Sequence, residues 1–494
     1  MTTEKKVRKK SKISNIFGTS GIRKIFLNYS ENDLMFTPHM ALDVGLALGT
    51  YLNRKTSKFP NGTTVVIGRD IRMSALPIEY ALISGLISAG CTVKTLGIVT
   101  TPTLAISLEL MDADAGCMIT ASHNTPEYIG LKFWNPSGMG FTPDQEEEIS
   151  RIYEEKNFIK TEWDQVGKVT TINDINDSHI YQITEKIKFN GKNLNIIVDP
   201  GNGSSCEIVP KLLSSYNINL TTLNANMDGH FPGRHSEPSK ENLIQISKFL
   251  KTSQVEDIGL ALDGDADRII FLDEEGEIID PIRLLALMAK YELQKEDGGI
   301  INGRNKIIVT PINSSSLLED VLNPLGCEVE RCEVGDIKVA IALKEKNGFL
   351  GGENSGTYIW PDIHYGPDSI ATIARVLKMM VQEDKSLRQL LENIPKYPFY
   401  RQSYRLKKDI PFSDEINQNI ITIMKNTFEY LGNEVLRINR MDGVRFDYDE
   451  GWMLIRRSGT SPYLRISGES NINMEKSVEI NKIATQKMRE LDLI

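Results

Sequence analysis

The alternation of strand-like and helix-like segments is the feature that most restricts the fold of this chain. An Ala- and Leu-rich helical segment at residues 76–89 separates two short apolar segments, and the same strand-then-helix unit recurs later. The strand-like segments of these units include residues 64–68, 91–96, 115–120, 195–199 and 306–310. Such alternation predicts parallel α/β layers, here in three consecutive domains.

The character of the sequence changes after residue 395. A strand-like segment at 400–406 precedes a helical stretch near 416–431, short strands up to residue 466 and a final helix. This order predicts a smaller α+β domain. The predicted organisation is a basic tail at 1–14, α/β domains at 15–165, 166–277 and 278–395, and an α+β domain at 396–494.

Composition limits the classes of function. The 494 residues correspond to about three to four domains. The net charge of −9 argues against a general nucleic-acid binder. The sequence contains no run of about 18 apolar residues, so no membrane span is expected. The basic tail is expected to be disordered, and it is not followed by the apolar core and cleavage site of a signal peptide. The five cysteines are scattered, without metal-binding spacing, as expected of reduced thiols in a cytoplasmic protein.

Three aspartates at every second position follow the apolar segment 258–262. They are Asp263, Asp265 and Asp267, and Arg268 comes directly after them. A strand end can direct several carboxylates to one point, as Mg²⁺ requires, and arginine is suited to a phosphate oxygen. The segment therefore indicates a divalent ion beside a phosphate, and hence phosphoryl chemistry.

Two other interpretations of this segment are open. A calcium loop of the EF-hand type also places carboxylates at positions one, three and five, but its sixth position must be glycine and here is Arg268. The flanks at 258–262 and 269–272 also resemble strands rather than helices. A solvated acidic turn is the second alternative, because charge runs usually face water.

A second polar segment follows the strand-like residues 115–120. Ser122 stands where a side chain can be presented at the mouth of a sheet, as a nucleophile or a phosphate carrier. His123 and Lys132 are near in sequence, and either can handle a proton or a phosphate charge. The alternative is a polar turn capped by serine and asparagine.

Three further segments have weaker signals. Arg23 ends a glycine-rich segment and can reach an anion. Glu353 and Ser355 lie in a strand-to-turn segment suited to the hydroxyls of a polyol. Residues 456–465 combine arginines, small hydroxyls and a glycine, which suits a phosphate, although an exposed basic turn has the same composition.

Together these segments resemble the α-D-phosphohexomutase superfamily, from about residue 16 to the C-terminus. The resemblance implies three related α/β domains and a smaller last domain around a central cleft. It also implies an enzyme in which a phosphorylated serine and Mg²⁺ interconvert hexose 1- and 6-phosphates through a hexose 1,6-bisphosphate. Sugar phosphates are then the expected partners, with no nucleic acid or membrane, and the protein is expected to be a monomer or a homodimer.

The resemblance also implies a role for each matching residue. Ser122 is the expected phosphoserine and metal ligand, with Asp263, Asp265 and Asp267 as the other metal ligands. Around the transferring phosphoryl group the expected residues are Arg23, His123, Lys132 and Arg268. The sugar is expected to contact Asp336, Glu353 and Ser355. The residues expected to hold the second phosphate are Arg456, Ser458, Gly459, Thr460 and Arg465.

Several positions depart from the family pattern. Thr125, Lys24, Arg457 and Ser461 replace a usual proline, glycine, proline and glutamate. Thr357 replaces a histidine implicated in proton transfer. His123, Lys132 and His364 are the candidates for the base. These departures leave open a non-catalytic sugar-phosphate-binding protein, and a phosphatase with the same serine and metal is a third possibility.

The segment 334–337, where the family selects its hexose, resembles phosphoglucosamine mutases more than phosphomannomutase/phosphoglucomutases. Asp336 lies in this segment, and its carboxylate suits an amino group. Phosphoglucosamine mutase is therefore the expected activity, with phosphomannomutase/phosphoglucomutase as the alternative within the same superfamily.

Overall fold

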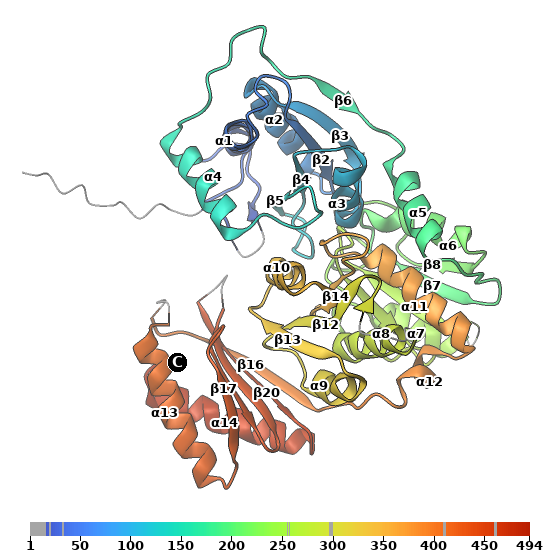
Figure 1. The fold of residues 1–494 in the computed structure, drawn as a ribbon, viewed down its shortest axis with the longest axis vertical. Coiled ribbons are helices and arrows are strands. Elements are labelled where there is room, and N and C mark those ends of the chain that lie inside the picture. The colour runs from blue at the N-terminus through green and yellow to red at the C-terminus, as the bar shows by residue number, and fades with distance from the viewer. Residues whose placement is uncertain are drawn as a thin grey trace, which may run out of the picture.

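Four β-sheets follow one another along the chain, and each is the centre of one domain (Figure 1). The structure is a computed structural model that describes residues 16–18, 21–31, 34–253, 255, 257–295, 300–408, 412–458 and 462–494. The predicted basic tail at 1–14 lies outside the described residues. None of the helices in the described ranges is long and apolar enough to cross a membrane.

The first domain is a six-stranded sheet between two helical layers. Its strand order is β1-β5-β4-β2-β3-β6. Helices α1, α2 and α4 pack on one face of the sheet and α3 on the other, each over an apolar cluster. The strands are β1 (Ile22–Ile25), β2 (Thr64–Arg69), β3 (Thr92–Ile98), β4 (Ala115–Ile119), β5 (Tyr128–Trp134) and β6 (Val169–Thr171). The helices are α1 (Pro38–Thr56), α2 (Ala75–Ser88), α3 (Thr101–Leu110) and α4 (Pro143–Glu155). Because β6 pairs with β3, this sheet reaches past residue 165.

The second and third domains share one hydrophobic core. A single cluster joins Leu212 of the second domain to Leu285 and Ile373 of the third. The second sheet has the order β10-β9-β7-β8, and the third has β11-β12-β14-β15 with β13 paired to β12. The second domain contains α5 (Ile175–Lys186), β7 (Asn195–Asp199), α6 (Ser205–Ser215), β8 (Asn219–Thr222), α7 (Ile244–Ser253), β9 (Ile258–Leu262) and β10 (Ile269–Leu272). The third contains α8 (Pro281–Lys295), β11 (Ile300–Ile301), β12 (Arg304–Pro311), α9 (Leu317–Leu322), a 3₁₀ turn (Asn323–Leu325), β13 (Glu328–Cys332), α10 (Asp336–Lys346), β14 (Gly348–Gly352), β15 (Tyr358–Ile359), α11 (Ser369–Glu383) and α12 (Leu387–Leu391).

The C-terminal domain is an antiparallel sheet of order β16-β20-β19-β18-β17, packed against two long helices. It meets the third domain where Trp452 and Leu454 pack on Ile312. Nearby, Arg445 donates to the Ile312 carbonyl at 2.5 Å. Its elements are β16 (Phe399–Arg405), α13 (Asp414–Tyr430), β17 (Val435–Asn439), β18 (Val444–Tyr448), β19 (Gly451–Arg457), β20 (Tyr463–Ser470) and α14 (Met474–Glu490).

The sheets of the first three domains are mixed, which differs from the parallel layers predicted from the alternation. Their central pairs are parallel, as in β2–β4, β7–β9 and β12–β14, but β4–β5 and β9–β10 are antiparallel. The segments that join these antiparallel pairs, at 120–127 and 263–268, are shorter than the dozen or so residues that a parallel crossover needs. Both are the polar segments singled out in the sequence.

Met139 of the first domain packs against the third domain. Its side chain is 6% exposed and lies in a cluster with Val309, Val339 and Ile359 of the third domain. We expect Met139→Ala to destabilise the protein by about 2–5 kcal/mol, because a cavity forms in the contact. Differential scanning calorimetry measures this against the control Met73→Ala, whose side chain is 69% exposed. Equal melting temperatures for the two variants would contradict this role of Met139.

Candidate active site

Ser122 stands on the connection between β4 and β5, three residues beyond the end of β4. Its backbone adopts the left-handed region, with φ of 50°, which costs a non-glycine residue about 1–2 kcal/mol. A hydrogen bond from the Ser122 N–H to Thr120 Oγ1, at 2.8 Å, helps to hold this conformation. The side chain is fully buried, so the hydroxyl faces protein groups.

The Ser122 hydroxyl meets the aspartate segment of the second domain. Its Oγ donates to Asp263 Oδ2 at 2.8 Å and lies 3.3 Å from Asp267 Oδ1. The Nδ1 of His123 is 3.3 Å from the same oxygen. Two segments predicted separately from the sequence, more than a hundred residues apart, are therefore in direct contact.

The three aspartates form one buried cluster. One oxygen of each, from Asp263, Asp265 and Asp267, lies within 4.8 Å of the others. All three residues are at most 7% exposed, which excludes the solvated turn. The flanking β9 and β10 pair as antiparallel strands, which contradicts the helical flanks of an EF-hand.

The electrostatics of this cluster fit a divalent cation. Burial and the two neighbouring carboxylates raise the pKa of Asp263 well above its ordinary value. The Oδ1 of Asp265 is buried and has no hydrogen-bond partner among the described residues, whereas its Oδ2 accepts from Thr101 and Lys132. A hard cation would relieve the repulsion and take up the free oxygen, as Mg²⁺ does in carboxylate sites.

Basic side chains surround the carboxylates. Lys132 contacts Asp265 at 3.0 Å and Asp267 at 2.5 Å. Although burial favours the neutral amine, these carboxylates raise the pKa of Lys132 above its ordinary value. Burial lowers the pKa of His123 to about 2, with Arg268 and Arg23 acting in the same direction, so the imidazole is neutral. The backbone N–H of Arg268 donates to Asp263 Oδ1 at 3.2 Å.

Two carboxylates of the third domain border this centre. Glu353 accepts from the Gly335 N–H at 3.1 Å, which places it against the turn that begins α10. Burial and the charge of Asp336, the first residue of α10, raise the pKa of Glu353 to about 7. Ser355 Oγ lies 3.1 Å from Thr357 Oγ1, so these two hydroxyls are hydrogen-bonded within the turn between β14 and β15.

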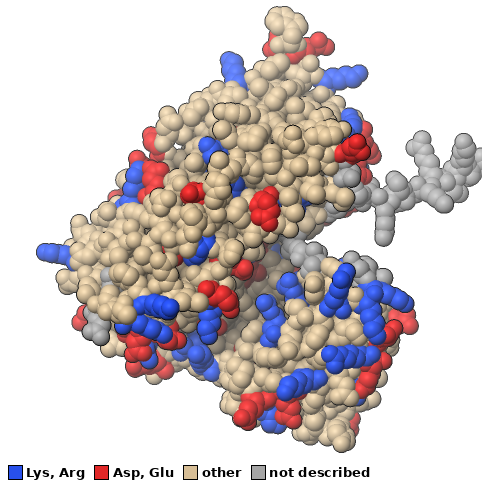
Figure 2. Space-filling view, turned by 180° about the vertical axis from the view of Figure 1, so that it is seen from behind, with Lys and Arg blue, Asp and Glu red and all other residues tan. Residues whose placement is uncertain are grey.

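Arg456 and Arg465 are on the C-terminal domain. They are directly opposite each other on the antiparallel strands β19 and β20. Arg456 Nε is 2.6 Å from Asp442 Oδ2, which also accepts from the Val334 N–H. Ser458 is buried and lies on the same strand end, whereas Gly459 and Thr460 fall outside the described residues. Like charges opposite each other on a sheet are unfavourable, and a bound anion would offset this repulsion. Figure 2 shows a hollow between this domain and the rest of the molecule, with basic side chains along its lower edge.

Thr101 is a site residue that the sequence reasoning missed. Its Oγ1 donates to Asp265 Oδ2 at 2.7 Å, and its N–H donates to the Asp265 carbonyl at 2.8 Å. Thr101 follows β3 at the same sheet edge as Ser122, and this position could have indicated a site residue. The indication was weak because threonines before a helix usually serve as helix caps.

His364, one of the three candidates for the base, has both ring nitrogens engaged. Its Nε2 lies 3.2 Å from Asp368 Oδ2, and its Nδ1 accepts from the Gly366 N–H at 2.9 Å. A ring held in this way has no free nitrogen for a sugar hydroxyl. His123 and Lys132 are the two candidates that contact the carboxylate centre or Ser122.

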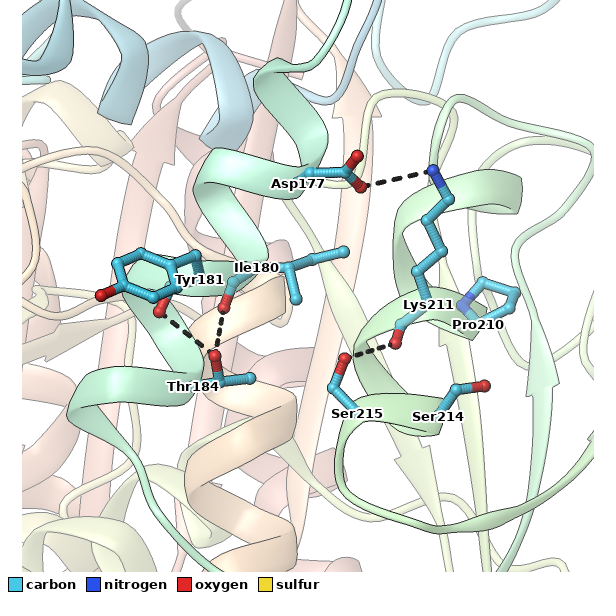
Figure 3. A pocket seen from close by; sticks show the side chains of 8 residues that line it. All are labelled: Asp177, Ile180, Tyr181, Thr184, Pro210, Lys211, Ser214 and Ser215. Atoms are coloured by element: carbon cyan, nitrogen blue, oxygen red, sulfur yellow. Dashed lines mark hydrogen bonds and ion pairs between the residues drawn. The ribbon is translucent and has the colours of Figure 1, made fainter.

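A separate groove of about 560 Å³ lies on the surface between α5 and α6 (Figure 3). Asp177 and Lys211 pair across it, and Tyr181 and Thr184 line its α5 side. None of the predicted site residues that the structure describes lines this groove. The chemistry is therefore concentrated at the junction of the domains.

Sequence comparison identifies the family. The phosphoglucomutase/phosphomannomutase patterns match in order: domain I at residues 14–160, domain II at 177–276, domain III at 280–397 and the C-terminal domain at 416–476. The chain belongs to this family. The predicted α-D-phosphohexomutase superfamily and its four-domain fold are thereby confirmed.

Individual relatives agree with the family over nearly the whole chain. A probable phosphoglucosamine mutase of Methanopyrus kandleri is 37% identical, covering 92% of this chain and 93% of its own. A phosphoglucomutase/phosphomannomutase of Thermococcus kodakarensis is 34% identical over 97% of this chain and 99% of its own length. The crystal structure of a family protein from Burkholderia thailandensis superposes with a TM-score of 0.81 at 26% identity, covering 96% and 97%.

Thr101→Val tests whether Thr101 orients Asp265 for the metal. We expect Mg²⁺ to bind about 10- to 100-fold more weakly, because valine keeps the shape but cannot hold Asp265 Oδ2. Isothermal titration with Mg²⁺ measures the affinity directly. Thr101→Ser keeps the hydroxyl and is the matched control. Equal affinities in the two variants would show that the hydrogen bond has no such role.

Proposed function

We propose that this chain is a phosphoglucosamine mutase. It interconverts the 6-phosphate and the 1-phosphate of a hexosamine through a phosphorylated Ser122 and a hexose 1,6-bisphosphate. One observation carries the proposal: the Ser122 hydroxyl of the first domain lies 2.8 Å from Asp263 within a buried cluster of carboxylates. A phosphoryl group on this oxygen would stand between the acidic cluster and the surrounding cations.

Asp263, Asp265 and Asp267, together with Ser122, are the residues that would hold Mg²⁺. When bound, the ion neutralises negative charge on the transferring phosphoryl group. Two observations support this assignment. Among the described residues Asp265 Oδ1 is buried without a hydrogen-bond partner, and burial together with the neighbouring carboxylates raises the pKa of Asp263.

The basic residues carry out the remaining charge neutralisation. Lys132, Arg268 and Arg23 would bind the equatorial phosphoryl oxygens, because phosphoryl transfer depends on charge neutralisation more than on covalent help from the protein. During transfer the bond from phosphorus to Ser122 Oγ breaks as the bond to a sugar hydroxyl forms on the opposite side. The proton that this hydroxyl loses is balanced by the one that Ser122 Oγ regains. His123, at 3.3 Å from Oγ, would therefore serve the serine end of this line as a neutral imidazole whose ring N–H donates a hydrogen bond to the leaving oxygen.

The preference for an aminosugar is supported by charge. Burial and the nearby charge of Asp336 raise the pKa of Glu353, so the two carboxyl groups are neighbours. Two neighbouring acidic groups suit a protonated amine better than a neutral hydroxyl. The name of the Methanopyrus relative, which is 37% identical, points to the same substrate.

The C-terminal domain is assigned to the phosphate that does not react. Arg456 and Arg465 would bind it together with Ser458, Gly459 and Thr460. Because one catalytic centre must serve both ends of the sugar, the bisphosphate has to turn between two half-reactions. A phosphate site on a separate domain can hold either end in turn.

The direct test is turnover of glucosamine, glucose and mannose 1-phosphates, with Mg²⁺ and a trace of the matching 1,6-bisphosphate. We expect glucosamine phosphate to react fastest. Ser122→Ala should lose at least about 10³-fold in kcat because the phosphate carrier is absent. It should also gain no phosphate by intact-mass analysis, whereas the control Ser178→Ala behaves as wild type. Release of inorganic phosphate in place of isomer would indicate a phosphatase, and inactivity on all three sugars would refute the mutase.

Arg456→Ala tests the distal phosphate site. We expect KM for the sugar phosphate to rise about 10- to 100-fold, since a charge-assisted hydrogen bond of about 1.5–3 kcal/mol is lost. Phosphorylation of Ser122 by the bisphosphate should still reach completion at high concentration. Arg437→Ala, on the exposed side of β17, is the control. A KM equal to that of this control would remove Arg456 from the site.

A further inference from the structure

A buried ion pair lies beneath the Ser122 segment. Asp70 and Arg72 follow β2, and their side chains are at most 1% exposed. Arg72 Nε donates to Asp70 Oδ2 at 3.0 Å. Neither residue was assigned a role from the sequence. A buried guanidinium is retained only where its donors are well used.

The remaining side-chain donors of Arg72 reach backbone carbonyls of the connection between β4 and β5 and of Tyr128, the first residue of β5. Nη2 donates to the Ser122 carbonyl at 2.8 Å and the Asn124 carbonyl at 2.7 Å. Nη1 donates to the Thr125 carbonyl at 2.6 Å and the Tyr128 carbonyl at 3.0 Å. One planar group therefore donates to four carbonyls within seven residues of the chain and ties them to a single point.

Asp70 reaches the other side of the Ser122 backbone. Thr120 Oγ1 donates to Asp70 Oδ2 at 2.6 Å and accepts from the Ser122 N–H at 2.8 Å. Both the N–H and the C=O of Ser122 are thus linked to Asp70, through Thr120 and through Arg72. This double attachment fixes the left-handed φ of 50° that directs Oγ to Asp263.

The second domain completes the arrangement. Ser236 Oγ lies 3.3 Å from the Ser122 carbonyl and 3.2 Å from the Asn124 carbonyl. The ring of Phe231 faces the Arg72 guanidinium, with 5.2 Å between the ring centre and Cζ. The domain that carries the metal carboxylates therefore also contacts the support of the serine.

We infer that Asp70, Arg72 and Thr120 are positioning residues for phosphoryl transfer, an inference that rests on the proposed function. They hold the Ser122 backbone so that Oγ keeps its place beside the metal carboxylates while the phosphoryl group is gained and lost. A displacement of about 1 Å at a reacting atom can cost about 10²-fold in rate. Lysine cannot replace Arg72, because an ammonium group lacks the planar fork that spans these carbonyls.

The experiment compares Arg72→Lys with Arg69→Lys. Arg69 is the matched control, since it lies at the end of the same strand and pairs with Glu79 at 2.9 Å, away from the serine connection. For Arg72→Lys we expect kcat to fall about 10²-fold, with KM for the sugar phosphate and half-saturation by Mg²⁺ within about threefold of wild type. Arg69→Lys should keep the wild-type kcat.

A second pair of variants separates positioning from folding. Thr120→Val should lower kcat in the same way, whereas Thr120→Ser keeps the hydroxyl and should restore it. A kcat for Arg72→Lys within about threefold of the Arg69→Lys value would overturn the inference. It would also be overturned if kcat fell, KM rose and the melting temperature fell together in Arg72→Lys, Thr120→Val and Thr120→Ser, because that pattern indicates general damage to the fold. Inactivity of the wild-type protein would instead count against the proposed function, so the two failures are distinguishable.

Discussion

The contact between Ser122 and Asp263 is the interaction on which the rest of the structure depends. It places a hydroxyl of one domain in a buried cluster of carboxylates from another, and such a cluster is unfavourable unless its charges are balanced. The junction therefore has to be rigid. Thr101 bonds to both the side chain and the backbone of Asp265, and Ser369 Oγ of the third domain donates to the Ala266 carbonyl at 2.6 Å. Three domains hold one centre.

The mixed sheets explain how two such segments meet. Strands β4 and β9 are central and parallel to a neighbour, so their carboxyl ends present side chains at a sheet edge, where α/β proteins bind ligands. The chain then returns at once as an antiparallel strand. A short return keeps the polar segment tight. In the first domain Arg72 donates to four carbonyls at or beside this return.

The sequence was most informative where a signal was continuous. The run Ile258–Leu262 is apolar at every position and forms β9 with the predicted bounds, because a strand buried on both faces needs no polar alternation. The serine and aspartate segments were predicted because polar groups directly follow such strands. The antiparallel pairing of β5 with β4 and of β10 with β9 was not predicted. The direction of a strand depends on the length of the connection before it, and the sequence pattern alone does not give that length. Arg72 was missed because a basic residue near a strand end usually indicates exposure, whereas its partners are carbonyls that carry no sequence signal.

The C-terminal domain stands apart in the way it is attached. The first three domains share side-chain and core contacts around the carboxylate cluster, whereas the last domain meets the body through Ile312, Ser316 and Val334 of the third domain. A reaction that turns its intermediate around needs one phosphate site that can move while the catalytic centre does not. Arg456 and Arg465 lie on the C-terminal domain, whereas the described contacts of Ser122 Oγ are with residues of the first two domains. A displacement of the C-terminal domain would therefore leave these contacts intact. Under the proposed function, the same separation accounts for a serine support built from the first and second domains, because the centre would keep its geometry while the phosphate site changed position.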